Sequence, residues 1–376
     1  MKKLIMTLAL LISILVCFES CGKEEIIINN ELEFEEYIQD EMALQNIPAL
    51  SVLMFKEGDI LYENYFGKSH IEQNVSLESD HPFLLASISK VVTATALLQL
   101  YEQELFALDN AINDYLPFPV SIPGYTTDIS FRMLLTHTSG IADGSALDDQ
   151  YYYGEDSPVE LEYFLRNYLK PGGDFYDATD NFYDFEPGTQ HEYSNTGSAL
   201  IGFLVERLTG TPFDLYCKQN IFNPLGMVNT SWRLEEITGT IVQPYSFSNG
   251  GYEAIEHYTF TDYPNGGLRS TAKDMFTLLS AFVQGGMANN YALLKPITIN
   301  EMITPQIPAI NNEVGLHLFV MDAEHGLWGH DGGEEGVATI MAFNPDTKVG
   351  AIILANQGDA ELEEILAEAY KLGLKL

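Results

Sequence analysis

The sequence predicts an α+β fold in which strands from both ends of the chain form one antiparallel sheet. Residues 49–55 and 60–66 near the start, and 337–343 and 349–354 near the end, are apolar, strand-like runs, paired across short turns. The chain between them is mostly helix-patterned or loop-rich, and no linker or internal repeat divides it. We therefore expect helices on the sheet and a helical subdomain inserted between the two strand pairs.

The elements follow in order along this plan. Phe34, Tyr37, Ile38 and Met42 mark one face of a first helix. Residues 57–59 (Glu-Gly-Asp) predict a hairpin between the first two strands.

Further along, a helix-like apolar run follows Ser87, and a second one follows Tyr193. Residues 344–347 (Asn-Pro-Asp-Thr) predict the turn between the last two strands, and residues 360–372 predict a closing helix.

The first twenty residues predict a secretory signal. Lys2 and Lys3 give a positive start, and the apolar run at 4–18 is too short to span a membrane. No later apolar run reaches that length. The sequence thus predicts a signal peptide at residues 1–20, a short linker at 21–30 and one domain at 31–376.

Cys21, directly after this signal, resembles the lipidated first residue of a bacterial lipoprotein. The residues Lys23-Glu24-Glu25 beside it resemble the surface-export tag of Bacteroidetes lipoproteins. The resemblance implies an exported protein held by its lipid to the outer membrane, in the periplasm or at the cell surface. The alternative is an ordinary cleaved signal followed by a disordered acidic linker.

The composition excludes several classes of protein. A net charge of −36 disfavours nucleic acid and anionic lipid surfaces as partners, and 46% hydrophobic residues exclude a disordered chain. Cys217 is the one cysteine left for the domain, so no disulfide is expected. Histidine spacing fits no zinc site and no glycine-rich nucleotide loop is present, so we expect no metal and no cofactor. We expect a monomer.

Ser87 and Lys90 form an S-x-x-K motif at the start of a helix-like run. Positions i and i+3 share a helix face, so a hydroxyl lies beside an amine. A lysine whose pKa is lowered by burial can take the proton of a serine nucleophile. A second copy, Ser270 to Lys273, has a structural explanation, because Thr271 and Asp274 read as a helix capping box.

Two further motifs follow Ser87 in order, whereas Ser270 has no Y-x-N tripeptide downstream of it. Tyr193-Ser194-Asn195 is a Y-x-N tripeptide at the start of a helical run, and His330-Asp331-Gly332 is an H-x-G tripeptide between a glycine-rich turn and a strand-like run. With these motifs, residues 31–376 resemble the class C β-lactamase and penicillin-binding-protein-like branch of the β-lactamase family. Segments such as LLTHTSGI (134–141) extend the resemblance. It implies the β-lactamase/transpeptidase-like fold, with a cleft between the sheet and the helical subdomain.

The resemblance also implies roles for these residues. Ser87 is the nucleophile that forms an acyl-enzyme, and Lys90 and Tyr193 share the proton transfers, with the base unassigned. Asn195 orients Lys90 and the substrate amide. The backbone N–H groups of Ser87 and Gly333 form the oxyanion hole.

The third motif departs from the penicillin-recognising pattern. Those members place a lysine and a hydroxyl residue where this chain has His330 and Asp331, and Glu334 and Glu335 follow. Carboxylates beside the cleft would repel an anionic substrate. Arg269 would offset this repulsion only if it reached the site.

Three functions remain open from the sequence. The first is a serine hydrolase acting on esters or on peptide-like amides with a neutral or cationic group near the scissile bond. The second is a D,D-carboxypeptidase or β-lactamase, and the third is a non-catalytic surface binding lipoprotein. The aromatic and acidic segment 143–186 reads as a surface loop whose aromatics pack on its own helices, with contact to sugars or cations as the alternative.

Overall fold

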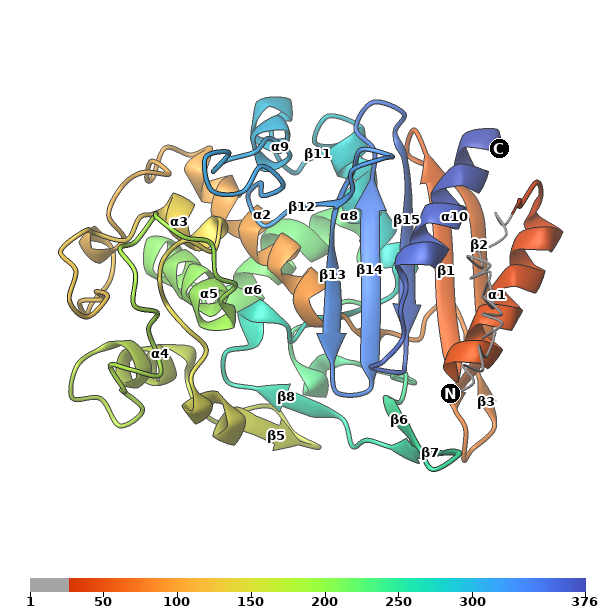
Figure 1. Cartoon of the computed structure of the whole chain (residues 1–376), viewed down its shortest axis with the longest axis horizontal. Coiled ribbons are helices and arrows are strands. Elements are labelled where there is room, and N and C mark those ends of the chain that lie inside the picture. The colour runs from red at the N-terminus through yellow and green to blue at the C-terminus, as the bar shows by residue number, and fades with distance from the viewer. Residues whose placement is uncertain (1–26) are drawn as a thin grey trace, which may run out of the picture.

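Seven strands form one antiparallel sheet in the order β12-β13-β14-β15-β1-β2-β3 (Figure 1). The computed structural model describes residues 27–376, so the signal, Cys21 and the start of the linker lie outside it. Strand β1 (Ala49–Lys56) pairs with β15 (Val349–Ala355), with Val52 opposite Ile353. Both ends of the chain therefore meet in one sheet, which confirms the predicted plan.

The two predicted hairpins are present at the ends of the chain. Between β1 and β2 (Asp59–His70), Glu57 and Gly58 both take positive φ values, 53° and 90°, as a tight hairpin turn requires. Strand β14 (Val337–Phe343) has the predicted bounds and turns into β15 at Asn344, whose side chain accepts from the N–H groups of residues 346 and 347. The closing helix α10 (Glu363–Lys375) begins and ends three residues later than predicted.

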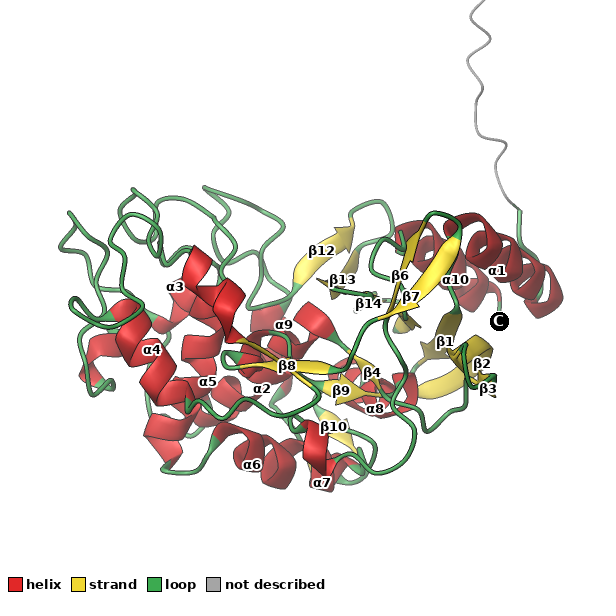
Figure 2. Cartoon of the chain, turned by 90° about the horizontal axis from the view of Figure 1, so that it is seen from below, coloured by secondary structure: helices red, strands yellow, loops and turns green. Residues whose placement is uncertain are grey.

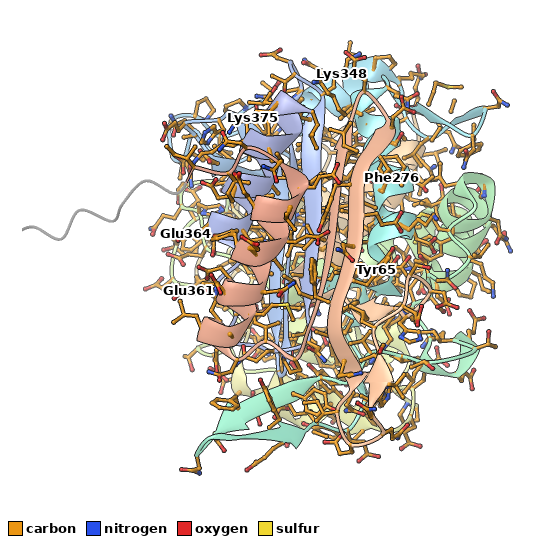
Figure 3. The ribbon with its side chains drawn as sticks, turned by 90° about the vertical axis from the view of Figure 1, so that its right-hand side faces the viewer. Tyr65, Phe276, Lys348, Glu361, Glu364 and Lys375 are labelled. Atoms are coloured by element: carbon orange, nitrogen blue, oxygen red, sulfur yellow. The ribbon has the colours of Figure 1, made fainter. Side chains whose placement is uncertain are left out.

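Helices cover both faces of the sheet. Helix α1 (Glu31–Gln45) and α10 lie on one face, against Val52 and its same-face neighbours, while Leu53 faces the other core. Figure 3 looks along the sheet, with Glu361, Glu364 and Lys375 on the α1/α10 side and Tyr65 and Phe276 on the other. Phe276 belongs to α8 (Ala272–Val283), which packs on that second face.

The inserted helical subdomain stands beside the sheet, as Figure 2 shows from below. Helix α2 (Ser89–Tyr101) joins the two parts, and every residue from Ser89 to Leu100 is buried, as expected for a helix that is covered on all sides. Its other helices are α3 (Phe131–Leu135), α4 (Leu161–Leu169), α5 (Asn195–Thr209), α6 (Phe213–Cys217) and α7 (Asn223–Leu225), and α9 (Pro296–Met302) follows later in the chain.

Short strands complete the structure and were not predicted. Strands of two to four residues show too little alternation to be recognised in a sequence. They are β3 (Val75–Ser76), β4 (Phe83–Leu84), β5 (Tyr151–Tyr153), β6 (Tyr245–Ser248), β7 (Gly251–Ala254), β8 (Tyr258–Phe260), β9 (Arg269–Ser270), β10 (Met287–Ala288), β11 (Tyr291–Ala292) and β12 (Phe319–Asp322). Over residues 27–376, no helix has the length and apolar character needed to cross a membrane.

Candidate active site

Ser87 lies in a short 3-10 turn, Ala86–Ile88, directly before α2. It is partly exposed, whereas Ala86 and Ile88 on either side are buried. Ala86 has a φ of 49°, a left-handed conformation that is costly for a residue with a Cβ. The turn therefore holds the partly exposed Ser87 in an otherwise buried segment, two residues before the first residue of α2.

The Lys90 amine is the hub of the site. Its Nζ lies 3.0 Å from Ser87 Oγ, 2.7 Å from Asn195 Oδ1 and 2.8 Å from the Asn265 carbonyl oxygen. A neutral amine has two N–H donors and one lone pair. The two carbonyl oxygens can accept the two N–H groups, which leaves the lone pair for the Ser87 hydroxyl proton.

Burial decides the charge state of this amine. Lys90 is fully buried, and this desolvation lowers its pKa to about 7, although the carboxylates of Asp143 and Asp262 act in the opposite direction. A substantial fraction of Lys90 is therefore neutral near pH 7. The amine can take the proton of Ser87 without first losing one of its own.

The Y-x-N motif opens helix α5. Ser194 is its N-cap, since its hydroxyl accepts from Gly197 N at 2.8 Å, and Asn195 is the first helical residue. Asp143 also caps this end, with carboxylate oxygens 2.8 and 2.9 Å from the N–H groups of Asn195 and Thr196. These caps fix Asn195 in the position from which it bonds Lys90.

Tyr193 packs around the lysine. The centroid of its ring is 4.9 Å from Lys90 Nζ, and His137 stacks on the same ring at 4.3 Å. Burial raises the pKa of the Tyr193 phenol well above its ordinary value, and the nearby Ser87 hydroxyl only partly offsets this. The two hydroxyl groups do not meet hydrogen-bond geometry, and the Tyr193 hydroxyl has no partner among residues 27–376.

His137 is a buried neighbour of the Y-x-N motif. Its Nδ1 accepts a hydrogen bond from Ser194 N at 3.1 Å, and its imidazole is buried with the rings of His191, His317 and Phe319 around it. This burial lowers the pKa of His137 well below its ordinary value. The imidazole is thus neutral and supports Tyr193 by stacking on its ring.

The H-x-G motif lies within β13 (Leu327–Glu334), which corrects its predicted place between a turn and a strand. The three glycines at 329, 332 and 333 weaken the strand pattern in the sequence. Gly332 is needed here, because a Cβ would lie 2.5 Å from Leu85 O and 2.9 Å from Ser87 N. This close approach brings β13 and Gly333 beside the nucleophile. The oxyanion hole at Ser87 and Gly333 stays a prediction.

His330 and Asp331 face different surroundings. The His330 side chain is 2% exposed, and burial with Lys90 nearby lowers its pKa to about 4, so it is neutral at pH 7. Its ring lies edge-on to Tyr193 at 6.3 Å. The Asp331 side chain is 64% exposed and carries its charge at the rim of the site.

The segment 143–186 reaches the site through Asp143 and Tyr151. Many of its aromatics do pack on their own helix, as Phe164 and Phe175 show. Tyr151, however, lies on β5, which pairs with β8, and its hydroxyl is 3.3 Å from Glu334 Oε1. Burial raises the pKa of Glu334, and the Tyr151 hydrogen bond favours its ionised form.

The second S-x-x-K copy lies elsewhere and is structural. Thr271 caps α8 by accepting from Asp274 N at 3.1 Å, but the Asp274 carboxylate bonds Asn229 N and Thr230 rather than closing the expected capping box. Ser270 is buried, with its Oγ 2.6 Å from Thr230 Oγ1.

Arg269 does not offset the negative charge of the carboxylates beside the site. It is buried and donates to the carbonyl of Tyr258. Its remaining guanidinium nitrogens have no partner in the described part of the chain. Across residues 27–376, no group of three or more His, Cys, Asp or Glu side chains is arranged to hold a metal ion.

The arrangement is that of an enzyme that transfers acyl groups through a serine. It combines an accessible hydroxyl, a buried amine with a depressed pKa and an adjacent tyrosine. The chain belongs to the Beta-lactamase family, whose model matches residues 34–375.

Sequence and fold comparisons with named proteins are consistent with membership of this family. The chain is 28% identical over 331 residues to penicillin-binding protein 4 of Amycolatopsis lactamdurans, covering 84% of this chain and 82% of that protein. It is 26% identical over 340 residues to Beta-lactamase-like protein 4 of Dictyostelium discoideum, covering 83% of this chain but only 57% of the relative's length. The fold matches that of an octameric penicillin-binding protein homologue from Pyrococcus abyssi with a TM-score of 0.71, at 23% identity and over 91% and 76% of the two chains.

Proposed function

We propose that this protein is a serine hydrolase that forms an acyl-enzyme on Ser87 and acts on small esters or peptide-like amides. The observation that carries the proposal is the buried Lys90 amine, 3.0 Å from Ser87 Oγ and held by two carbonyl oxygens. A purely structural lysine would gain nothing from burial beside an exposed hydroxyl, because desolvation of an ammonium is costly.

In the proposed reaction, Ser87 Oγ attacks the substrate carbonyl while neutral Lys90 accepts the hydroxyl proton. The tetrahedral oxyanion forms beside the N–H groups of Ser87 and Gly333. The bond to the leaving group then breaks, and that group departs with a proton from Lys90 or from the Tyr193 phenol. Water, deprotonated by the same pair, releases the acid and restores Ser87.

The depressed pKa of Lys90 and the raised pKa of Tyr193 favour lysine as the base in the first step. A phenolate at Tyr193 would have to form in a buried site, whereas neutral Lys90 is abundant near pH 7. Tyr193 is then suited to donate its proton to the leaving group. We therefore propose Lys90 as the base, a choice that the sequence left open.

The rim of the site selects against anionic substrates. Asp331 is exposed there. Glu334, the last residue of β13, and Glu335 after it are contacted by the hydroxyl groups of Tyr151 and Tyr153, respectively. We propose that substrates carry a neutral or cationic group next to the scissile bond. A β-lactam or a D-Ala-D-Ala terminus carries a carboxylate instead, and a D,D-carboxypeptidase or β-lactamase is therefore the second candidate, favoured by the names of the relatives.

Intact mass spectrometry tests the proposal directly. The protein is treated in parallel with an activated ester, a fluorophosphonate and a penicillin, and the modified peptide is sequenced. We expect adducts on Ser87 with the first two reagents and a much slower adduct with penicillin. Rapid acylation by penicillin would favour the second candidate, and no adduct with any reagent would favour a non-catalytic binding protein.

The substitution Asp331→Thr tests the role of the acidic rim. It removes one charge and adds a hydroxyl, so we expect the rate of acylation by penicillin to rise relative to that by a neutral ester. Repulsion between solvent-exposed charges about 4 Å apart is worth about 1 kcal/mol, which corresponds to roughly fivefold. Stopped-flow or mass spectrometric rates measure the ratio.

Asp346→Asn is the matched control for that experiment. Asp346 is also exposed, but it lies in the β14–β15 turn, at the opposite end of β14 from Glu334. The acidic-rim hypothesis fails if both variants change the penicillin-to-ester ratio equally, or if the wild-type protein reacts as fast with penicillin as with the ester.

The location of the protein is part of the same proposal. We propose a monomeric lipoprotein of the cell envelope, anchored through Cys21 after removal of residues 1–20, because the positive start, short apolar run and cysteine occur in that order. On expression in a bacterial host, wild type is expected in the detergent phase of a Triton X-114 partition and Cys21→Ala in the aqueous phase. Recovery of both in the aqueous phase would contradict the anchor.

A further inference from the structure

A polar cavity lies outside the active site, where α4 and α5 meet the turn Tyr263–Asn265. Its volume is about 310 Å³, within the size range of small-molecule sites. Residues from four separate segments converge on it, and both signs of charge are represented. The lining includes Glu160, Phe203, Glu206, Arg207, Arg233 and Tyr263.

The acidic side of the cavity is Glu206. One of its oxygens accepts from Phe213 N at 2.8 Å, and the other has no hydrogen-bond partner among the described residues. Burial raises the pKa of this carboxyl to about 7, so the bare group is only partly ionised at neutral pH. A cationic ligand would supply a partner for this second oxygen and would favour the ionised form of the Glu206 carboxyl.

Two further lining residues, Arg233 and Tyr263, carry hydrogen-bond donors. The Nε of Arg233 bonds Asp214 Oδ2 at 2.6 Å and the guanidinium lies 4.6 Å from the centre of the Tyr263 ring, which leaves the outer nitrogens available. The Tyr263 hydroxyl is buried and has no partner within residues 27–376. Buried hydroxyl groups are normally hydrogen-bonded, so this hydroxyl has bonding capacity that the described residues leave unused.

The turn that lines this cavity also holds the catalytic lysine. Tyr263 belongs to the cavity, Pro264 O accepts from Thr93 on α2 at 2.6 Å, and Asn265 O accepts from Lys90 Nζ at 2.8 Å. Gly202 on α5 allows the turn to pack closely, because a Cβ there would lie 2.6 Å from the Pro264 ring. Because the turn is closely packed, a displacement of Tyr263 would also shift the Asn265 carbonyl.

We propose that this cavity binds a small zwitterion, a free amino acid or a dipeptide, and that its occupancy changes the reactivity of Ser87. The ammonium group would lie on Glu206, and the carboxylate on Arg233 and the Tyr263 hydroxyl. Binding draws Tyr263 toward the ligand and so repositions the carbonyl that orients Lys90. The effect on turnover rests on the proposed hydrolase function, whereas the binding does not.

Calorimetry on the full-length chain tests the binding with three probes: glycine, ethylamine and acetate. We expect glycine to bind more tightly than either half-molecule. Tyr263→Phe, which removes only an unpartnered hydroxyl, should weaken glycine binding about tenfold, and Glu206→Gln at least as much. Tyr37→Phe is the matched control, because the Tyr37 hydroxyl is also buried without a partner in the described chain but belongs to α1, on the far face of the sheet.

Equal glycine affinity in wild type, Tyr263→Phe and Glu206→Gln would overturn the site, as would the absence of binding at tens of millimolar. The coupling is read from the rate of Ser87 acylation by p-nitrophenyl acetate. Saturating glycine should change it at least twofold in wild type and not in Tyr263→Phe. Binding without a rate change overturns the coupling alone. Glycine binding with no acylation at all contradicts the hydrolase function and leaves the site standing.

Discussion

Ser87→Ala should abolish the hydrolysis of p-nitrophenyl esters, with a loss of roughly a thousandfold or more in kcat/KM. Removal of a nucleophile leaves only binding and electrostatic contributions to catalysis. Ser87 is the hydroxyl that faces the lone pair of Lys90, and nothing else in the site can form the acyl bond at that position. Release of p-nitrophenol measures the loss, and intact mass should show no acyl adduct on the variant.

The second S-x-x-K copy supplies the control for this experiment. Ser270→Ala removes a buried hydroxyl that bonds Thr230 and is expected to cost about 1 kcal/mol of stability, with turnover unchanged. Thermal unfolding of both variants separates loss of fold from loss of chemistry. Equal losses of activity in Ser87→Ala and Ser270→Ala would contradict the assignment of the nucleophile.

The large elements of the fold could be predicted because their patterns are long. Strands β1, β14 and β15 are runs of seven or eight residues of which nearly all are buried. Helix α1 buries the apolar residues Phe34, Tyr37 and Ile38, and α10 has one apolar face. Pairing of the two chain ends was predicted because the strand-like runs lie at both ends of the sequence, with a mostly helical and loop-rich middle. Strand β13 was not predicted, because its glycines weaken the strand pattern in the sequence. One of them, Gly332, is what allows the strand to approach the nucleophile closely.

In the candidate site, too, some residues could be predicted from the sequence and others could not. Ser87, Lys90, Tyr193 and Asn195 were identified from motif order, and the structure brings them together around one amine. What the sequence could not show is the supporting set, which comes from segments without a motif.

Three members of that supporting set illustrate the reason. Asp143 caps α5 from a loop, Asn265 offers only its backbone carbonyl, and Tyr151 reaches Glu334 through a three-residue strand. A carbonyl carries no residue-type signal, and a loop aspartate looks like any other solvated charge. Such positions become visible only once the chain is folded.

Lys90 determines how the activity should depend on pH. The neutral amine is the active form in the proposed mechanism, and its pKa is lowered to about 7. For wild type we expect log kcat/KM to rise with a slope of about one below that pH and to level off above it. Below the pKa, each pH unit should cost about tenfold, because the protonated amine cannot accept the Ser87 proton.

The substitution Lys90→Arg tests whether Lys90 acts as a proton acceptor or only as a positive charge. A guanidinium stays protonated throughout the accessible pH range, so it keeps a cation beside Asn195 but cannot accept a proton. We expect a loss of roughly a thousandfold or more at every pH from about 6 to 9, with the rise through pH 7 absent. Tyr193→Phe should lose less, about a hundredfold, and should keep the wild-type profile, since it removes a proton donor and leaves the base in place.

Lys273→Arg is the matched control, because Lys273 is the exposed lysine of the second S-x-x-K copy. It should reproduce both the wild-type rate and the wild-type profile. A wild-type profile that is flat from about pH 6 to 9, or a Lys90→Arg variant that retains the rise, would show that another group takes the serine proton. Tyr193 would then be the remaining candidate. Because its pKa is raised, the phenol would have to pass its own proton to the substrate in the same step in which it accepts the Ser87 proton.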